Sequence, residues 1–142
     1  MYTNLKKKLQ EGFTLVEILI VVVIVGILAA IAIPTYYNYV KKGYATEAKT
    51  QIKSIVQSAD MYRSEYGSYP PDCWETMDEM GFIEMKKSVT QKWEFECTFD
   101  EDGEGGKITA TSTDLMQGGA GNKIEYDKAE GKFIGYGQGS GQ

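Results

Sequence analysis

The chain has 142 residues, a net charge of −5 and no histidine. The missing histidine excludes the commonest general base and the commonest metal ligand, and with them a Ser-His dyad or a zinc site of the usual sort. The acidic balance argues against direct binding of nucleic acid, because neutralising phosphates requires Lys and Arg.

Residues 1–12 are predicted to be a leader peptide. Lys6, Lys7 and Lys8 stand directly before a long apolar run, and positive charge in this place is typical of a targeting segment that stays on the cytoplasmic side. Residues 13–142 carry 12 basic and 19 acidic groups, a net charge of −7. Beyond the apolar run they leave roughly 100 residues, enough for one small domain.

The apolar run covers residues 13–33, where Thr14 and Glu17 are the only polar side chains. Its 21 residues would span roughly 30 Å as a helix, about the hydrocarbon thickness of a bilayer, so a membrane segment is predicted. A carboxylate inside such a helix costs about 2–3 kcal/mol or more. Glu17 is therefore a functional candidate.

The residues around Glu17 carry a resemblance to a known family. Gly12, followed by the sequence FTLVE and an unbroken aliphatic run behind a Lys-rich leader, resembles the class III signal of type IV pilins and pseudopilins. The resemblance implies that a prepilin peptidase cuts after Gly12 and methylates the new amino terminus at Phe13. It also implies that Glu17 helps to place each subunit in a helical filament. It covers the N-terminal half of the chain, and the rest matches in architecture only.

An ordinary secretory signal is the alternative interpretation of this segment. Residues 18–29 would be its apolar core, and residues 30–32, Ala-Ile-Ala, its cleavage site. This interpretation leaves Glu17 unexplained, and it removes a helix that continues in register beyond Pro34.

Gly26 within the run and Pro34 directly after it also match the pattern of the pilin family. Gly26 and Ala30 form a small-xxx-small pair that allows close helix approach, although membrane helices also use small residues without such a role. Pro34 has no N–H and clashes with the carbonyl group of Ala30, so the helix is expected to kink or loosen there. By resemblance, assembled filaments lose helical hydrogen bonds between Gly26 and Pro34.

Residues 13–40 are predicted to form a membrane and filament-core helix, and residues 41–66 its amphipathic continuation, ended by Gly67. Gly43 weakens the continuation by up to about 1 kcal/mol. Apolar residues recur there at spacings of three and four, as on one face of a helix: Ala45, Ala48, Ile52, Ile55, Ala59, Tyr62 and Tyr66.

Four tyrosines, Tyr36, Tyr37, Tyr39 and Tyr44, cluster just beyond the apolar run. Amphipathic rings in this place are typical of the aromatic belt at a membrane surface. The alternative, by similarity to some short pilins, is a stack of aromatic rings that carries charge along a conductive filament.

Residues 67–142 are predicted to form a connector and a four-stranded antiparallel sheet, which together with the helix gives an α+β fold. Asp72 is expected to cap a short helix that Gly81 closes. Strands are expected at residues 93–99, 107–113, 124–126 and 133–136, separated by turns rich in Gly and Asp. The short helix is expected to carry Trp74, Met77 and Met80, and the residues after it are expected to pack on the long helix: Phe82, Ile83 and Met85.

Cys73 and Cys97 are the only cysteines, and the predicted topology places both outside the cytoplasm. An even pair in an oxidising compartment favours a disulfide, which would join the connector to the first strand. Closing a loop of this length stabilises the folded state by roughly 3–4 kcal/mol in the chain-entropy model. The alternative is two unrelated buried thiols.

The acidic segment at residues 100–104 offers closely spaced oxygen ligands that suit Ca²⁺, with Asp100, Asp102 and Glu104 as weak candidates. The twelve-residue calcium-loop pattern is absent, and Asp-Gly is also a standard hairpin turn, so a solvated turn and no cofactor are expected. Two Gly-Lys pairs lack the spacing of a phosphate-binding loop, and no enzyme is predicted.

The sequence therefore predicts a structural subunit of a type IV pilus, exported from the inner membrane to the cell surface. The alternatives are a periplasmic pseudopilin of type II secretion, a conductive filament, and a membrane-tethered binding module that does not polymerise. The implied partners are further copies of the chain, the peptidase and methyltransferase, and an assembly platform with its ATPase. In a filament, Glu17 is expected to pair with the amino terminus at Phe13 of a neighbour, because no Lys or Arg lies between Lys8 and Lys41.

Overall fold

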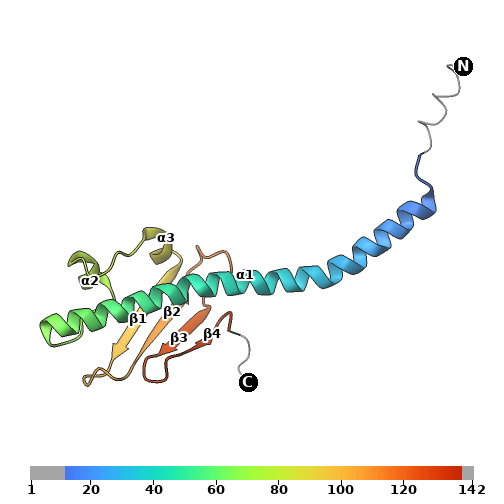
Figure 1. The fold of residues 1–142 in the computed structure, drawn as a ribbon. Helices are drawn as coiled ribbons and strands as arrows, with labels where there is room; N and C mark the ends of the chain where they lie inside the picture. The colour runs from blue at the N-terminus through green and yellow to red at the C-terminus, as the bar shows by residue number, and fades with distance from the viewer. Residues whose placement is uncertain (1–11, 139–142) are drawn as a thin grey trace, which may run out of the picture. The chain divides into compact units, whose positions relative to one another are not determined.

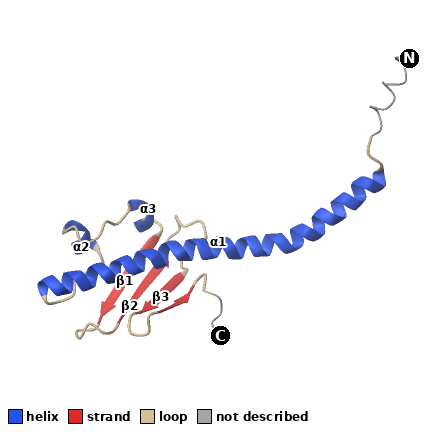
Figure 2. Ribbon diagram, viewed as in Figure 1, coloured by secondary structure: helices blue, strands red, loops and turns tan. Residues whose placement is uncertain are grey.

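The computed structural model describes residues 12–138, which divide into two compact units between Tyr37 and Asn38. Helix α1 is assigned over Leu15–Tyr66, 52 residues, and contributes to both units. It begins two residues after the predicted start at Phe13 and ends at the predicted residue. It is the only regular element in the described part of the first unit (Figure 2).

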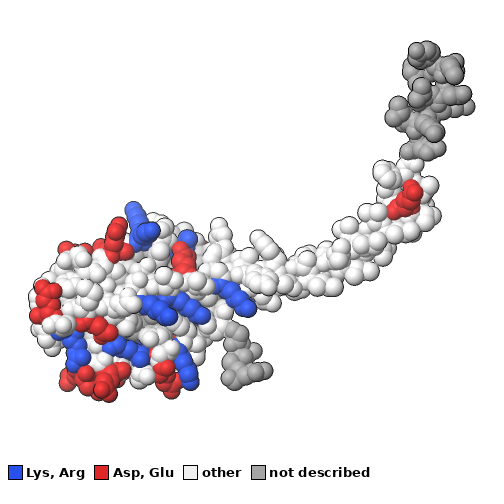
Figure 3. All heavy atoms as spheres, viewed as in Figure 1, with Lys and Arg blue, Asp and Glu red and all other residues white. Residues whose placement is uncertain are grey.

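The first unit presents its apolar side chains to the outside. The large apolar residues between Phe13 and Ile33 are between 48% and 86% exposed, and α1 is long and apolar enough, by length and composition, to cross a membrane. Figure 3 shows this stretch nearly free of charged residues. The helix assignment continues through Pro34, and the neighbouring Thr35 hydroxyl donates to the carbonyl oxygen of Ile31 at 3.0 Å.

The second unit is built on an antiparallel sheet of four strands in the order β1-β2-β3-β4. The strands are β1 Trp93–Phe99, β2 Gly106–Ser112, β3 Lys123–Asp127 and β4 Lys132–Gly135. Trp93 lies opposite Ser112, and Ile124 lies opposite Gly135. Figure 1 shows the part of α1 that belongs to the second unit laid across one face of this sheet. The predicted α+β fold is confirmed, but Tyr136, expected in the last strand, falls after β4 because the chain turns at Gly135, which has a φ of +105°.

The core of the second unit lies between α1 and the sheet. The predicted apolar face of the helix is buried from Ala45 to Ala59, and Val56 and Ser58 are buried beside it. Tyr66 is an exception at 51% exposed, because it is the last residue of α1, where its ring contacts Tyr62 and Phe82 at the margin of the core. The buried residues that the sheet contributes are Trp93, Phe95, Ile108, Ala110, Ser112 and Ile124.

The connector contains two short helices, α2 Glu75–Glu79 and α3 Lys87–Thr90, of which α3 was not expected. The N-cap residue of α2 is Trp74, which makes no side-chain cap hydrogen bond, and not Asp72 as predicted. Asp72 lies two residues earlier, and its carboxylate accepts hydrogen bonds from the backbone N–H and the hydroxyl of Thr76 in the first turn. Met77 is fully buried, whereas Met80 is 45% exposed, because α2 ends before it and the chain reverses at Gly81, where φ is +80°.

Candidate functional site at the start of the apolar helix

Thr14 and Glu17 form a reciprocal pair of hydrogen bonds at the first turn of α1. The backbone N–H of Thr14 donates to Oε2 of Glu17 at 2.8 Å, and the backbone N–H of Glu17 donates to the hydroxyl of Thr14 at 3.2 Å. The carbonyl oxygen of Thr14 accepts the first helical hydrogen bond, from Ile18. This is a capping box, in which two backbone donors that a helix start leaves unpaired are satisfied by side chains.

The capping box gives Glu17 a defined local role. A carboxylate also favours the positive end of the helix dipole. Among the described residues, Oε2 of Glu17 accepts one hydrogen bond and Oε1 accepts none, so the carboxylate retains acceptor capacity for a second partner. Phe13, Glu17, Ile18, Ile20 and Val21 line a shallow apolar hollow of about 520 Å³ around it.

Gly26 and Pro34, which match the pattern of the pilin family, are both exposed. No atom outside the helix backbone lies within 4 Å of a Cβ placed on Gly26, so this face of α1 is open to a close neighbour. Pro34 lies within the continuous helix assignment. The expected loss of hydrogen bonds between Gly26 and Pro34 concerns assembled filaments and stays a prediction.

The four tyrosines do not form one stack. Tyr36 and Tyr37 meet edge to face with ring centres 6.3 Å apart, and both are exposed. Tyr44 is instead held within the second unit, where its hydroxyl donates to the side chain of Gln117 at 2.5 Å.

Cys73 and Cys97 form the predicted disulfide, with their Cα atoms 5.0 Å apart. The bond joins the connector before α2 to strand β1, and Cys73 is buried in the core. Among residues 12–138 no cysteine is free. The role of this bond is structural, because it ties the connector to the sheet.

The acidic segment at residues 100–104 forms the turn between β1 and β2. The carboxylate of Asp102 accepts the backbone N–H of Glu104 at 3.0 Å, and Gly103 turns the chain with a φ of +82°. Within the described residues, no three Asp, Glu or Cys side chains are grouped as metal ligands would be. Asp100, Asp102 and Glu104 thus lie in a hydrogen-bonded turn, and the expectation that this turn holds no cofactor stays a prediction.

The capping box is the feature that the sequence analysis missed. Its signal was visible, because a Thr followed three residues later by a Glu before an apolar run is the known pattern of such a helix start. Considering Glu17 only as a charge in an apolar helix hid its second role as the acceptor for the backbone of Thr14.

Some known proteins match this chain mainly over its N-terminal segment. The family model of the prokaryotic N-terminal methylation motif matches residues 7–33. The "Type II secretion system core protein G" of Pseudomonas aeruginosa is 42% identical over 66 residues, 46% of this chain and 46% of that protein.

Two relatives match over most of the chain. The "Fimbrial protein EcpC" of Eikenella corrodens is 33% identical over 120 residues, which cover 83% of this chain and 74% of that protein. The "Type IV major pilin protein PilE1" of Neisseria gonorrhoeae is 31% identical over 120 residues, 84% of this chain and 66% of that protein. The match to these relatives extends well beyond the apolar run into the second unit.

Proposed function

The chain belongs to the type IV pilin family, and on that premise we propose that it is the structural subunit of a type IV pilus. The observation that carries the proposal is the exposed apolar helix with its acid at the first turn. A single chain leaves these apolar side chains unburied. Lipid surrounds them before assembly, and further copies of the same helix surround them in the filament core.

Processing prepares this helix for assembly. A prepilin peptidase cuts after Gly12 and methylates the amine of Phe13, which frees the helix from Lys6, Lys7 and Lys8 of the leader. The chain then waits as a single-pass protein of the inner membrane. It has no catalytic role of its own, so an assembly platform and its ATPase supply the energy that extracts it from the bilayer.

Glu17 sets the step between subunits. An unpaired carboxylate among apolar helices costs several kcal/mol, so it needs a cation at the same depth. The amino terminus at Phe13 of a neighbouring subunit is that cation, because the described chain offers no Lys or Arg before Lys41. The capping box turns one carboxylate oxygen toward the chain's own Thr14 and leaves the other for the neighbour.

Three variants in a strain without the wild-type chain test this role. Glu17→Ala removes both the cap and the charge, whereas Glu17→Gln keeps a side chain that caps well but carries no charge. Thr14→Ala removes only one half of the capping box. If charge pairing drives assembly, filament yield falls sharply in both Glu17 variants and mildly in Thr14→Ala, while cleavage after Gly12 continues in all three.

Electron microscopy and intact mass of sheared filaments provide the readout. Normal filaments from Glu17→Gln with poor filaments from Glu17→Ala would assign the effect to the helix cap and contradict the pairing. Normal filaments from both Glu17 variants would contradict any role of the acid. If the strain with the wild-type chain makes no surface filaments that contain this chain, the proposed function itself is contradicted.

A pseudopilus of type II secretion is the second candidate, favoured by the 42% identity to a secretion protein over the N-terminal 66 residues. In that case the same helix packing forms a filament confined to the periplasm. Neighbouring genes for secretion rather than for pilus retraction, together with the absence of the chain from sheared surface material, would favour it over a pilus.

A further inference from the structure

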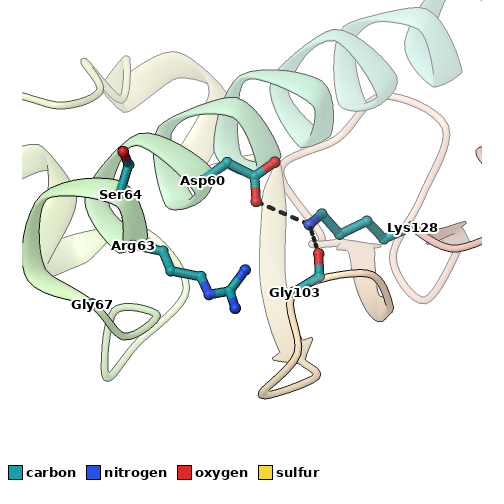
Figure 4. A pocket seen from close by; sticks show the side chains of 6 residues that line it. All are labelled: Asp60, Arg63, Ser64, Gly67, Gly103 and Lys128. Atoms are coloured by element: carbon teal, nitrogen blue, oxygen red, sulfur yellow. Dashed lines mark hydrogen bonds and ion pairs between the residues drawn. The ribbon is translucent and has the colours of Figure 1, made fainter.

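Lys128 lies at the turn after β3 and is nearly buried, with its side chain only 11% exposed. Its ammonium group donates to Oδ1 of Asp60 at 2.9 Å, to the hydroxyl of Tyr69 at 2.9 Å and to the carbonyl oxygen of Gly103 at 2.5 Å. Figure 4 shows Asp60 and Gly103 converging on it. A lysine has three N–H donors, so every donor has one acceptor.

The three acceptors come from three separate parts of the second unit. Asp60 is on α1, Tyr69 follows the end of that helix, and Gly103 is in the turn between β1 and β2. The hydroxyl of Tyr69 also donates to Oδ1 of Asp60 at 2.8 Å, which closes a ring of hydrogen bonds around the ammonium. The ammonium of Lys128 thus joins its own turn to two regions that are remote in sequence: the end of α1 with Tyr69, and the turn between β1 and β2.

Arg63 supports the same arrangement from the helix side. Its guanidinium donates to the carbonyl oxygens of Glu101 at 3.1 Å and Asp102 at 2.8 Å. Three consecutive carbonyl groups of the acidic turn are therefore bound by two cations, through the backbone rather than through the carboxylates. The ring of Tyr69 stacks on Phe99 with centres 4.4 Å apart.

Burial disfavours the charged ammonium, but the hydrogen bonds to Tyr69 and Asp60 outweigh this effect and raise the pKa of Lys128 above its ordinary value of 10.5. The group is therefore fully charged at neutral pH, as a central cation must be.

We propose that Asp60, Tyr69 and Gly103 form a cation site for a primary ammonium, filled in this protein by Lys128 and used to fix the β1–β2 turn on α1. A cleft of about 500 Å³, lined by Asp60, Arg63, Ser64, Gly67, Gly103 and Lys128, opens this site to solvent. Removing the lysine side chain leaves the three oxygens in place with room for a small amine. A divalent metal fits less well, because Ca²⁺ takes six to eight oxygens and Arg63 adds a positive charge nearby.

Chemical rescue of Lys128→Ala in the full chain, held in detergent, tests this site. Amide hydrogen exchange is followed at residues 101–105, the turn that the site holds. The variant should exchange there at least about tenfold faster than the wild type, and ethylammonium chloride at about 100 mM should restore most of the protection. Tetramethylammonium chloride at the same concentration has no N–H donor and should restore none.

Two controls separate the site from a general loss of charge. Lys132→Ala removes a lysine that is 74% exposed and should leave exchange at the turn unchanged. Lys128→Met fills the space of the lysine stem, so ethylammonium should not rescue it.

Unchanged exchange in Lys128→Ala, or equal rescue by both salts, would overturn the proposal. If Lys128→Ala fails to fold, Tyr69→Phe decides, since it removes one of the three acceptors and keeps the stacking ring. Faster exchange at the turn in Tyr69→Phe supports the site, and wild-type exchange in that variant contradicts it.

Discussion

Two isoleucines show how differently the two units of this protein use apolar residues. Ile24 in the first unit is 51% exposed, although it lies in the middle of a regular helix, whereas Ile52 in the second unit is fully buried. Both belong to α1, and both have good apolar neighbours in sequence. The difference is that the second unit contains a sheet that covers Ile52, whereas the described part of the first unit is a single helix that leaves Ile24 half exposed.

Fully burying an isoleucine stabilises a fold by about 1.5–3 kcal/mol. The second unit gains this stabilisation within one chain, so its core specifies a fold. The first unit gains this stabilisation only where lipid or other helices surround it. Its residues therefore determine in which surroundings the helix is stable. Helix packing in such surroundings depends on close approach and on polar pairing more than on apolar area. Gly26, which allows close approach, and Glu17, which can pair, are therefore the residues of the first unit expected to matter most for packing.

Gly12→Val should reduce filament formation more than any other single change, because it acts at cleavage, before the helix can pack with other helices in a filament. A bulky residue at this position is expected to block cleavage, so that Lys6, Lys7 and Lys8 stay attached to the helix. Moving each of these charges through an apolar core costs about 2.5–3.5 kcal/mol or more. Filaments should be absent, and intact mass of the membrane fraction should show the uncut chain.

Gly43→Ala is the matched control for that experiment. No atom outside the helix backbone lies within 4 Å of a Cβ on Gly43, and alanine favours a helix. Cleavage and filaments should be normal in this variant. Cleaved and assembled protein from Gly12→Val would contradict the processing step.

The sequence predicted most of the second unit because its signals are local. The alternation from Trp93 to Phe99 gave the bounds of β1 without error, and the spacing from Ala45 to Ala59 gave the buried face of α1. Helix α3, with four residues, has too few positions to show a period. The exposure of Tyr66 and Met80 depends on where α1 and α2 end relative to the core, which no local pattern contains.

Ile52→Ala and Ile24→Ala provide the sharpest test of the comparison. Ile52→Ala should lower the free energy of unfolding of the second unit by about 2–5 kcal/mol, since it leaves a cavity under the sheet. Ile24→Ala should leave that free energy unchanged. Both tryptophans, Trp74 and Trp93, lie in the second unit, so their fluorescence during denaturation of the full chain in detergent reports on it. Equal losses in the two variants would break the comparison.

Replacing both cysteines by serine should cost the second unit roughly 3–4 kcal/mol, because the disulfide closes a loop with a sequence separation of 24. Denaturation of the full chain in detergent measures the loss, and reduction of the wild type should reproduce it. The double variant should not respond to the reductant. Two thiols that alkylate in the native wild type would contradict the bond.

The site regions differ in what the sequence could reveal. The capping box lies within four residues, and its pattern was readable at Thr14 and Glu17. The partners of Lys128 lie 68, 59 and 25 residues away, so only the folded arrangement brings them together. Charge alone is a poor guide there, because Arg63 and Lys128 bind backbone carbonyl groups of the acidic turn instead of its carboxylates.

Ion pairs on the surface of the second unit should contribute least to its free energy of unfolding. Lys107 pairs with Glu125 at 2.7 Å across β2 and β3, and the hydrogen bond that its ammonium donates to Glu125, together with the charge of that carboxylate, raises the pKa of Lys107 above 10.5. A pKa raised by folding adds stability that is complete below pH 10.5 and disappears as the pH rises through the folded value. The lysine side chain is 54% exposed, so water and salt screen the pair.

Lys107→Met should therefore change the unfolding free energy far less than Ile52→Ala, and Lys107→Arg should restore the wild-type value. In 1 M NaCl, where the screening length is about 3 Å, the difference between wild type and Lys107→Met should vanish. A loss that persists in high salt would mean that the lysine stem, not its charge, stabilises the sheet.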